Sequence, residues 1–290
     1  MAVTTVADLD SIIQTIVGEV RFTARHAVPM AGLVTRIDMP EHRGSPIDLP
    51  KLDTLTAFDL TEGVDWNSFE TVGDTDVSID PTEVGVFVAL TDRMLRRSPQ
   101  AFERTVSSEA KRAYSYKLDL DLTRQVSSFS TQLIGTGNPV SIGGLTAARA
   151  QITGKTEPGE QDINVCLHPY HIKDLVDDLV AAASTDVGSG MSDEITRNYL
   201  TRNYIGRTKL YGMGVYEDGN FEVDGTPNAH GVVMSRNAIF LAITLEPTEE
   251  NDRDISLRGE ELVIVGEYGY AEWLDNAGVD IFGNATAPTG

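Results

Sequence analysis

Apolar residues near the N-terminus recur with helical spacing. The segment "TTVADLDSIIQTIVGEVRFTA" places Val6, Leu9, Ile12, Ile16 and Val20 three or four residues apart. This spacing puts apolar side chains on one face of a helix, so an amphipathic helix is predicted here. The next 27 residues, "RHAVPMAGLVTRIDMPEHRGSPIDLPK", contain four prolines and little helical periodicity. They predict an extended arm that lies along another surface, and residues 1–46 are taken together as an N-terminal arm.

Residues 47–90 predict a long extended hairpin. Apolar and polar residues alternate in "AFDLTEGVDW", and the β-rich stretch "VGVFVAL" follows Pro81. The two stretches are interpreted as the arms of the hairpin, with a polar tip that contains Gly and Asp between them. A long hairpin with little core of its own is at best marginally stable alone. It therefore needs a partner surface.

A long helix is predicted from about Ser98 to Ser130. Ser98 suits the N-cap, Pro99 suits the first helical position, and no Gly or Pro follows before Ser130. A helix of roughly 30 residues would be about 45 Å long. Its apolar stripe consists of Phe102, Val106, Ala110, Ala113, Tyr114, Leu118, Leu122, Val126 and Phe129.

After the Gly-rich loop "GTGNPVSIGG" the pattern becomes that of a compact α/β domain, over residues 160–245. "INVCLH" predicts a buried strand, "PYHIKDLVDDLVAAA" a helix entered through Pro169, and "DEITRNYLTRNYIG" a second helix closed by Gly206. "GVVMSRNAIFLAI" is interpreted as a strand followed by a helix. The last segment, "ELVIVGEYGYAEWLDNAGVDIFG", predicts two closing strands that return to the long helix.

Composition places the chain among ordinary globular proteins. It has 290 residues, 41% hydrophobic and 23% charged, which argues against disorder. The single cysteine, Cys166, excludes an internal disulfide framework and lies in an alternating apolar run, which favours a core residue over a reactive thiol. No apolar stretch is long enough to span a bilayer, and no signal peptide pattern is present. A reducing, soluble compartment is expected.

Charge is strongly negative and unevenly distributed. There are 44 acidic and 23 basic residues, and the formal net charge is −21. Such a field repels phosphate backbones and anionic lipids, so sequence-specific DNA binding and membrane association are disfavoured. One block, residues 47–90, sets ten acids against Lys51: Asp48, Asp53, Asp59, Glu62, Asp65, Glu70, Asp74, Asp76, Asp80 and Glu83. The next block, residues 91–130, carries eight bases against five acids: Arg93, Arg96, Arg97, Arg104, Lys111, Arg112, Lys117 and Arg124.

Two patterns resemble metal sites and are rejected. His168 and His171 form H-x-x-H, but a metal site needs a third ligand, and the glutamate base of H-E-x-x-H is missing. A strand end that meets a helix start is the simpler interpretation. The acids of "DTDVSID" are spaced as in a calcium loop, yet Ile79 and Gly85 stand where that loop requires Gly and Glu.

Two further patterns resemble enzyme motifs and fail as well. Gly212 and Gly214 lack the third glycine and the following helix of a dinucleotide fingerprint, so a turn is favoured. Ser141 and Ser235 have no G-x-S-x-G frame. No catalytic, cofactor-binding or metal-binding residue is therefore predicted, no cofactor is expected, and the chain is interpreted as a non-enzyme.

The order of these elements resembles the major capsid protein of tailed double-stranded DNA phages, an α+β fold of HK-phage type that is shared with encapsulins. The resemblance covers nearly the whole chain and rests on "TEVGVFVALTDRML", "YIGRTKLYGMGVYEDGN", "GVVMSRNAIFLAI" and "ELVIVGEYGYAEWLDNAGVDIFGNA" in that order. It implies an N-terminal arm (1–46), an extended hairpin or E-loop (47–90), a peripheral or P-domain with a spine helix (91–159 and 246–290), and an inserted α/β axial or A-domain (160–245).

The resemblance also implies a function and partners. Copies of the chain would form pentameric and hexameric capsomers and then an icosahedral shell, the virion capsid, assembled in the host cytoplasm around DNA that is enclosed without sequence-specific binding. A portal is expected, with a decoration or cement protein as an optional partner. Since only residues 1–46 precede the hairpin, the scaffold is expected to be a separate protein. An encapsulin shell is the alternative, and an unrelated acidic α/β enzyme is a third, disfavoured one.

Some members of this family crosslink a hairpin Lys to an Asn of a neighbouring subunit. Here Lys51, near the hairpin root, is the only hairpin lysine, while Asn276 and Asn284 lie in the last segment. A non-covalent shell is therefore expected. In the family the hairpin reaches over the neighbouring subunit near its long helix, and the two charge blocks suggest that the acidic hairpin docks on the basic face of the next copy. The predicted interface residues are Asp59, Glu62, Asp65, Glu70, Asp74, Arg93, Arg96, Arg97, Arg104, Lys111 and Arg112.

Overall fold

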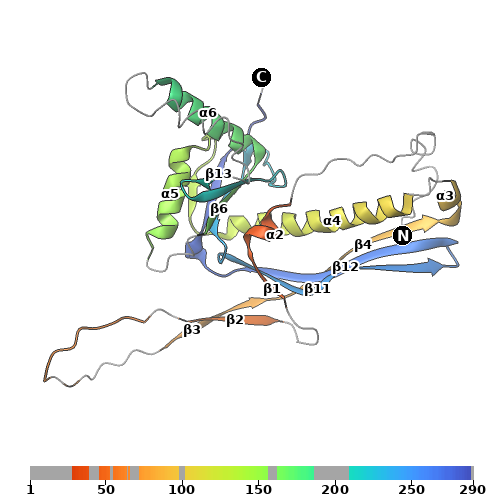
Figure 1. Ribbon diagram of the computed structural model, residues 1–290, viewed down its shortest axis with the longest axis horizontal. Helices are drawn as coiled ribbons and strands as arrows, with labels where there is room; N and C mark the ends of the chain where they lie inside the picture. The colour runs from red at the N-terminus through yellow and green to blue at the C-terminus, as the bar shows by residue number, and fades with distance from the viewer. Residues whose placement is uncertain are drawn as a thin grey trace.

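The computed structural model describes residues 28–38, 46–52, 55–63, 65, 72–97, 102–155, 162–185 and 209–288. The molecule is elongated and has three parts (Figure 1). A compact α/β part lies at one end, a long helix above an extended sheet runs toward the other end, and a two-stranded hairpin projects away from both. The predicted helices near the N-terminus and over residues 193–206 lie outside the described residues.

The extended sheet has four strands in the order β1-β11-β12-β4. Strand β1 is parallel to β11, and the other neighbours are antiparallel. Between Leu262 and Tyr268, every second residue of β12 is buried, as expected for a strand with one covered face. The strands are β1 (Thr35–Asp38), β4 (Thr82–Thr91), β11 (Ile239–Asp254) and β12 (Gly259–Glu272).

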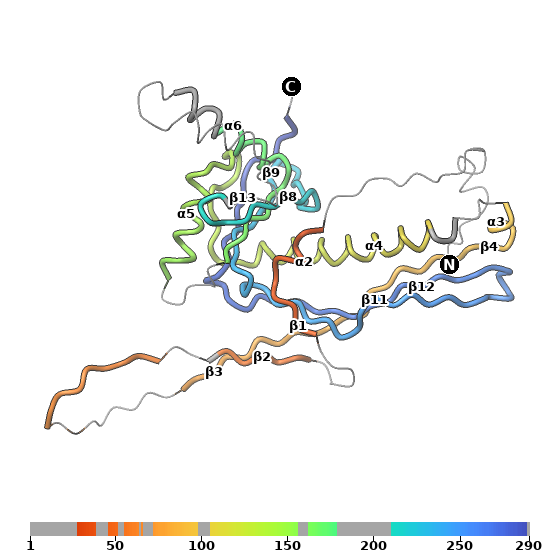
Figure 2. Tube along the Cα trace, in the orientation of Figure 1, coloured from red at the N-terminus to blue at the C-terminus, as the bar shows by residue number. Residues whose placement is uncertain are grey.

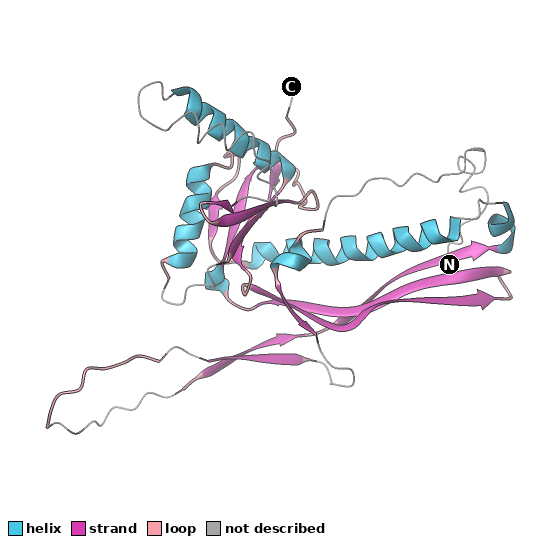
Figure 3. Cartoon of the chain, in the orientation of Figure 1, coloured by secondary structure: helices cyan, strands magenta, loops and turns pink. Residues whose placement is uncertain are grey.

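The long helix α4 (Phe102–Gln125) covers this sheet (Figure 3). Its buried face, with Ala110, Tyr114 and Leu122, shares one core with β12 and with the short helix α2 (Met30–Leu33). At 24 residues it is about 36 Å long, shorter than predicted. It ends in the 3-10 turn η2 (Val126–Ser128), which leads into the α/β part.

The predicted helix also begins later than the sequence pattern indicates. A separate helix, α3 (Asp92–Arg97), precedes it, so the first three arginines of the basic block lie on α3 and not on α4. Proline disfavours helical backbone in the residue before it, and the Ser98–Pro99 pair falls between the two helices. The N-cap predicted at Ser98 lies outside the described residues.

The α/β part is built on a seven-stranded sheet, whose main path is β5-β13-β10-β6-β8-β7 with β9 on β13. As predicted, β6 is a strand, buried at all five positions, and α6 follows it. Strands β5 and β13 and helix α5 lie outside residues 160–245, yet they pack into the same part. The elements are β5 (Gln132–Ile134), α5 (Ile142–Thr153), β6 (Ile163–Leu167), α6 (Pro169–Thr185), β7 (Lys209–Leu210), β8 (Met213–Glu217), β9 (Asn228–Ala229), β10 (Val232–Ser235), the 3-10 turn η3 (Asp275–Ala277) and β13 (Gly278–Asn284).

The segment "GVVMSRNAIFLAI" forms a strand, a turn and a second strand, so the predicted helix is wrong. The turn is closed by the Ala238 N–H donating to the Ser235 carbonyl at 3.0 Å, and the chain continues as β11. Residues 239–243, "IFLAI", are rich in β-branched and aromatic side chains, and their pairing with both β1 and β12 favours the strand. Helix α5 was not predicted: Ser141 caps it by accepting from the Gly144 N–H at 3.1 Å, so Gly143 and Gly144 belong to its first turn.

The hairpin is present, but both of its arms differ from the prediction. The described residues of "AFDLTEGVDW", predicted as the outgoing arm, form no strand and turn at residues 62–63. Strand β2 (Ile47–Leu52) pairs antiparallel with β3 (Asp74–Ile79), in register from Ile47 opposite Ile79. "VGVFVAL" belongs instead to β4, which pairs with β12. The base of the hairpin is held by a small apolar cluster of Ile47, Ile79 and Ala242, and beyond it the two limbs extend away from the rest of the chain (Figure 2).

Candidate subunit interface

The hairpin carries exposed negative charge along its whole described length. Each of its described acids is exposed: Asp48, Asp59, Glu62, Asp65, Asp74, Asp76, Asp80 and Glu83. Large apolar side chains are also exposed there, with Leu55 at 60%, Phe58 at 50% and Leu60 at 71%. A contiguous exposed patch of this kind marks an interaction surface. Asp53 and Glu70 lie outside the described residues.

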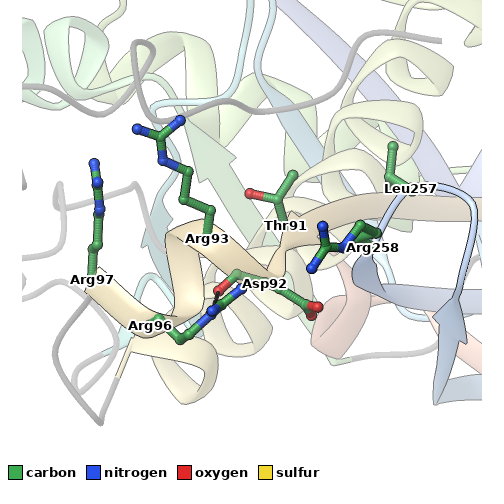
Figure 4. A pocket seen from close by; sticks show the side chains of 7 residues that line it. All are labelled: Thr91, Asp92, Arg93, Arg96, Arg97, Leu257 and Arg258. Carbon is green, nitrogen blue, oxygen red and sulfur yellow. Dashed lines mark hydrogen bonds between the residues drawn. The ribbon is translucent and has the colours of Figure 1, made fainter.

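Arginines gather at the opposite end of the molecule. A pocket of about 460 Å³ lies where α3 meets the turn between β11 and β12. Four of its seven lining residues are arginines (Figure 4). The lining consists of Thr91, Asp92, Arg93, Arg96, Arg97, Leu257 and Arg258. In a chain whose net charge is −21, this is a local reversal of sign that suits an anionic partner.

Hydrogen bonds fix the frame of this pocket. The Asp92 N–H donates to the Arg258 carbonyl at 2.8 Å, which joins the start of α3 to the turn. The Asp92 carboxylate accepts from Arg253 at 3.0 Å, and Arg96 Nε donates to the Asp92 carbonyl at 3.1 Å. Arg93 and Arg97 are exposed and form no ion pair with any other residue that the structure describes. Among the described residues, these two guanidinium groups have no charged partner, so we consider them candidates for contact with a second copy.

The cations of the long helix whose side chains the structure describes have partners within their own chain. Lys111 Nζ lies 2.6 Å from Glu249 Oε2 on β11, and this hydrogen bond lowers the pKa of the Glu249 carboxyl. Arg112 pairs with Glu109 at 3.0 Å, and Lys117 pairs with Asp121. Of the predicted interface, Arg104 has no described side chain, and Lys111 and Arg112 are already engaged. Among the described residues of the predicted interface, the cations without an ion-pair partner therefore lie on α3.

The acidic hairpin and α3 are far apart within one chain. In Figures 1 and 2 the hairpin limbs end at one extreme of the long axis, and α3 lies at the other. A contact between them must therefore join two copies of the chain. Sequence reasoning found the α3 arginines by counting charges, but it missed Arg258 and Leu257. The sequence "LRGE" could have indicated a turn with an exposed arginine. Its position beside α3, however, follows only from the pairing of β12 with both β4 and β11.

The residues that resembled catalytic or metal sites have structural roles. The two histidines occupy a strand end and a helix start, as expected: the His168 Nδ1 accepts from the Tyr170 N–H at 3.2 Å, and the His171 Nε2 lies 3.3 Å from the Gly283 carbonyl. Burial lowers the pKa of His171. Within the described ranges no three metal-ligating side chains gather.

Cys166 and the other candidates fit the same description. Cys166 is fully buried, and burial raises the pKa of its thiol well above the ordinary value, which keeps it protonated and unreactive. Gly212, at a φ of 81°, turns the chain between β7 and β8. The Asn276 Oδ1 accepts from Lys155 at 3.0 Å. Across the part of the chain that the structure describes, no helix is long and apolar enough to cross a membrane.

Comparison with known proteins gives matches of structure only. No family model matches the sequence, and no curated protein matches it. A chain from the solved structure of Mycobacterium phage Che8 is similar at a TM-score of 0.69 and 15% identity, over 91% of this chain and 94% of that one. A chain from the capsid structure of cyanophage P-SCSP1u has a TM-score of 0.70 at 13% identity, over 96% and 95% of the two chains.

A third match comes from the head structure of Helicobacter pylori bacteriophage KHP40. Its TM-score is 0.73 at 9% identity, over 99% of this chain and 100% of that one. The mixed helix and sheet content of this chain is also that of the predicted α+β class. The chain therefore has, over nearly its whole length, the fold found in solved capsid and head structures of phages.

Proposed function

We propose that this chain is the major capsid protein of a tailed phage, which self-assembles into the icosahedral head shell around a double-stranded DNA genome. The observation that carries the proposal is the extent of the structural match, since 99% of this chain aligns with 100% of a chain in a phage head structure. Neither chain has a sizeable part without a counterpart in the other. A structural role also agrees with the engaged, buried state of the residues that resembled catalytic ones.

In this proposal the three parts of the molecule take the roles of a capsid subunit. The hairpin on β2 and β3 is the E-loop within residues 47–90, and α4 is the spine helix of the P-domain (91–159 and 246–290). The seven-stranded sheet is the core of the A-domain, centred on residues 160–245 and completed by α5, β5 and β13. The arm, residues 1–46, reaches the core through β1, which extends the four-stranded sheet beside β11.

The proposed subunit contact joins opposite charges. The exposed acids of one hairpin, among them Asp59, Glu62 and Asp65, would dock on the α3 arginines of the next copy. The exposed Phe58 and Leu60 would lose water contact on docking, which favours association at about 25 cal/mol per Å² of apolar surface. Charge would set register and orientation more than affinity. Glu70, Asp74, Arg104, Lys111 and Arg112 would lie at the margin of this contact.

The proposed partners follow from a shell of this kind. Hexameric and pentameric capsomers would assemble in the host cytoplasm on a separate scaffold, around a portal, and a decoration protein would bind outside. The DNA would be enclosed without sequence-specific contacts, because a surface with a net charge of −21 per copy repels phosphate.

The test is to express and purify the full chain and to measure its size by chromatography and negative-stain imaging. Hollow particles or capsomers are expected, and without a scaffold they should be heterogeneous. A monomer that stays monomeric at high concentration would overturn the proposal of a shell protein. Uniform shells from the lone chain would leave that proposal standing and would overturn the proposal of a separate scaffold. A defined enzyme cargo copurifying inside the shell would point to an encapsulin instead.

A further inference from the structure

Three parts of the chain meet at one buried polar cluster. Asp119 lies on the long helix α4, Asp218 follows β8 of the seven-stranded sheet, and Met30 begins α2 of the N-terminal segment. All three are fully buried, and Asn220 is 3% exposed. Burying two carboxyl groups together costs free energy unless charge is removed or compensated. The hydrogen bonds of the cluster show how this occurs.

N–H groups surround one of the two carboxyls. The Met30 N–H donates to Asp119 Oδ1 at 3.0 Å, and Asn220 Nδ2 donates to Asp119 Oδ2 at 2.8 Å. Both oxygens of Asp119 therefore accept hydrogen bonds, which suits the ionised form. In Asp218 only Oδ1 accepts an N–H, from Asn220 at 2.9 Å, and Oδ2 has no N–H or O–H donor among the described residues.

The second carboxyl lies beside the first. Asn220 joins the two, since its N–H donates to Asp218 Oδ1 and its Nδ2 donates to Asp119 Oδ2, and a direct hydrogen bond between the two carboxyls is one of the causes that raise the pKa of Asp218. Two carboxyl groups can form such a bond only when one of them carries a proton, because both ionised forms are acceptors. The proton belongs on Asp218 Oδ2, the oxygen that has no other donor. The pair therefore holds one proton and one negative charge between the helix and the sheet.

The pKa of Asp218 is raised to about 8, mainly by burial and in second place by the neighbouring Asp119. The hydrogen bond from the Asn220 N–H acts in the opposite direction and lowers this pKa. No cation of the described chain is among the groups that set this pKa. From β6 the neighbouring titratable group is the Cys166 thiol, whose pKa is raised mainly by burial and also by Asp218 and Asp119, so that it stays neutral. On α4 the next carboxyl, Asp121, is bonded to Tyr268 and Lys117 instead. From α2 the Met30 N–H donates to Asp119.

We propose that the Asp119–Asp218 carboxyl pair is a proton-operated latch, which ties the N-terminal segment and the A-domain sheet to the long helix and loosens when the shared proton is lost. The inference rests on contacts within one subunit, so it does not depend on shell formation. When the proton leaves, two negative charges face each other in a site without a compensating cation among the described residues. Opening relieves the repulsion by letting water reach both carboxyls.

The direction and size of the effect follow from linkage. In the closed latch the pKa of Asp218 is about 8, whereas an exposed Asp titrates near 3.8. The closed state therefore holds a proton that the open state has lost between these two values. Closure is most favourable at low pH, and the ratio of open to closed forms should rise about tenfold per pH unit up to about pH 8. Above that pH both forms are deprotonated, so the ratio should level off.

Amide hydrogen exchange tests the latch in the full-length protein. The Met30 and Asn220 amides both donate to the pair, so their protection factors, corrected for intrinsic exchange, report its opening. We expect protection to fall about tenfold per pH unit between pH 5 and pH 8 and to become flat above pH 8. Protection that does not change over this range in the wild-type protein would overturn the proposal, without need of any variant.

Two variants separate the latch from a merely structural role. In Asp218→Asn the amide still donates to Asp119 but cannot titrate, so protection at Met30 should become independent of pH. The matched control, Asp121→Asn, removes another buried carboxyl of the same helix and should keep the wild-type slope. A slope that survives in Asp218→Asn would refute the latch. Protection that responds to calcium chloride and to EDTA would show that a cation, and not a proton, occupies the pair.

Discussion

Reversing Arg93 and Arg97 to Glu should weaken assembly while leaving the subunit folded. Both side chains are exposed, and neither has an ion-pair partner within the described chain, so their loss removes no contact that holds the fold. If the acidic hairpin of a second copy docks on α3, the double variant replaces two attractions by two repulsions. The fold and the subunit contact can therefore be separated experimentally.

The size of the effect can be worked out from the exposure of the two sites. An exposed ion pair contributes about 0 to 1 kcal/mol, and a like-charge pair costs a similar amount, so two reversals should weaken each contact by about 1 to 3 kcal/mol. Because each subunit would donate one hairpin and accept another, this is also the loss per subunit. A change of about 1.4 kcal/mol is tenfold, so the concentration needed for assembly should rise roughly 10- to 100-fold.

The assay compares the double variant with wild type by sedimentation and electron microscopy over a range of protein concentration and salt. Arg124→Glu with Lys173→Glu is the matched control, because it changes net charge equally at exposed cations that pair within the chain with Glu222 and Asp177. Wild-type assembly should weaken between about 0.15 M and 1 M salt, as the screening length falls from about 8 Å to about 3 Å. Circular dichroism should be unchanged in both variants.

Assembly of Arg93→Glu/Arg97→Glu at wild-type concentration would refute the docking on α3. An equal loss in the control variant would show that total charge matters and not the arginine pocket. Assembly that is lost in the double variant but insensitive to salt in wild type would mean that the arginines act through shape or packing. None of these results decides whether the chain forms a shell, which the separate test of particle formation addresses.

Three further predictions concern other parts of the molecule. Gly278→Ala should destabilise the fold by about 1 to 3 kcal/mol in urea denaturation, because a Cβ there would lie 2.3 Å from the buried ring of Phe129. Because its bond to Asp280 raises the pKa of His230, stability should fall as pH rises through this raised pKa, and Asp280→Asn should remove that dependence in pH-dependent melting. At about 0.15 M salt the protein should bind duplex DNA no better than an equally acidic control, and micromolar retention in a filter assay would contradict this.

Local pattern predicted individual elements better than their pairing. The strand with Cys166 and the helix that starts at Pro169 were identified because each is marked by nearby residues. The strand Thr82–Thr91 was also identified, but it was assigned to the hairpin. An alternating pattern indicates that one face of a strand is buried, but it does not identify the element that covers this face. In the fold Val84 and Val86 face the core beneath α4, and β3 is the strand that pairs with β2 in the hairpin.

The candidate site was predictable only where charge is dense along the sequence. Counting charges found Arg93, Arg96 and Arg97, but it could not tell that Lys111 and Arg112 on α4 pair with Glu249 and Glu109. Arg258 was missed because it reaches α3 through the pairing of β12 with β4, a contact between residues far apart in the chain. The Asp119–Asp218 pair was missed for the same reason, since each acid by itself looks like an ordinary solvated residue.

The placement of the two charged ends constrains what kind of assembly the proposed contact can build. The proposed contact joins the hairpin of one copy to the arginine pocket at the other end of a second copy. Two antiparallel copies can make it twice about a two-fold axis, whereas a head-to-tail arrangement makes it once per copy and is heterologous. Heterologous contacts close into rings when the rotation between neighbours allows it, and otherwise continue as open chains. The proposed capsid requires the head-to-tail arrangement, because pentameric and hexameric capsomers are rings of copies related by rotation, and the hairpin and α3 of one chain lie at opposite ends as that arrangement needs.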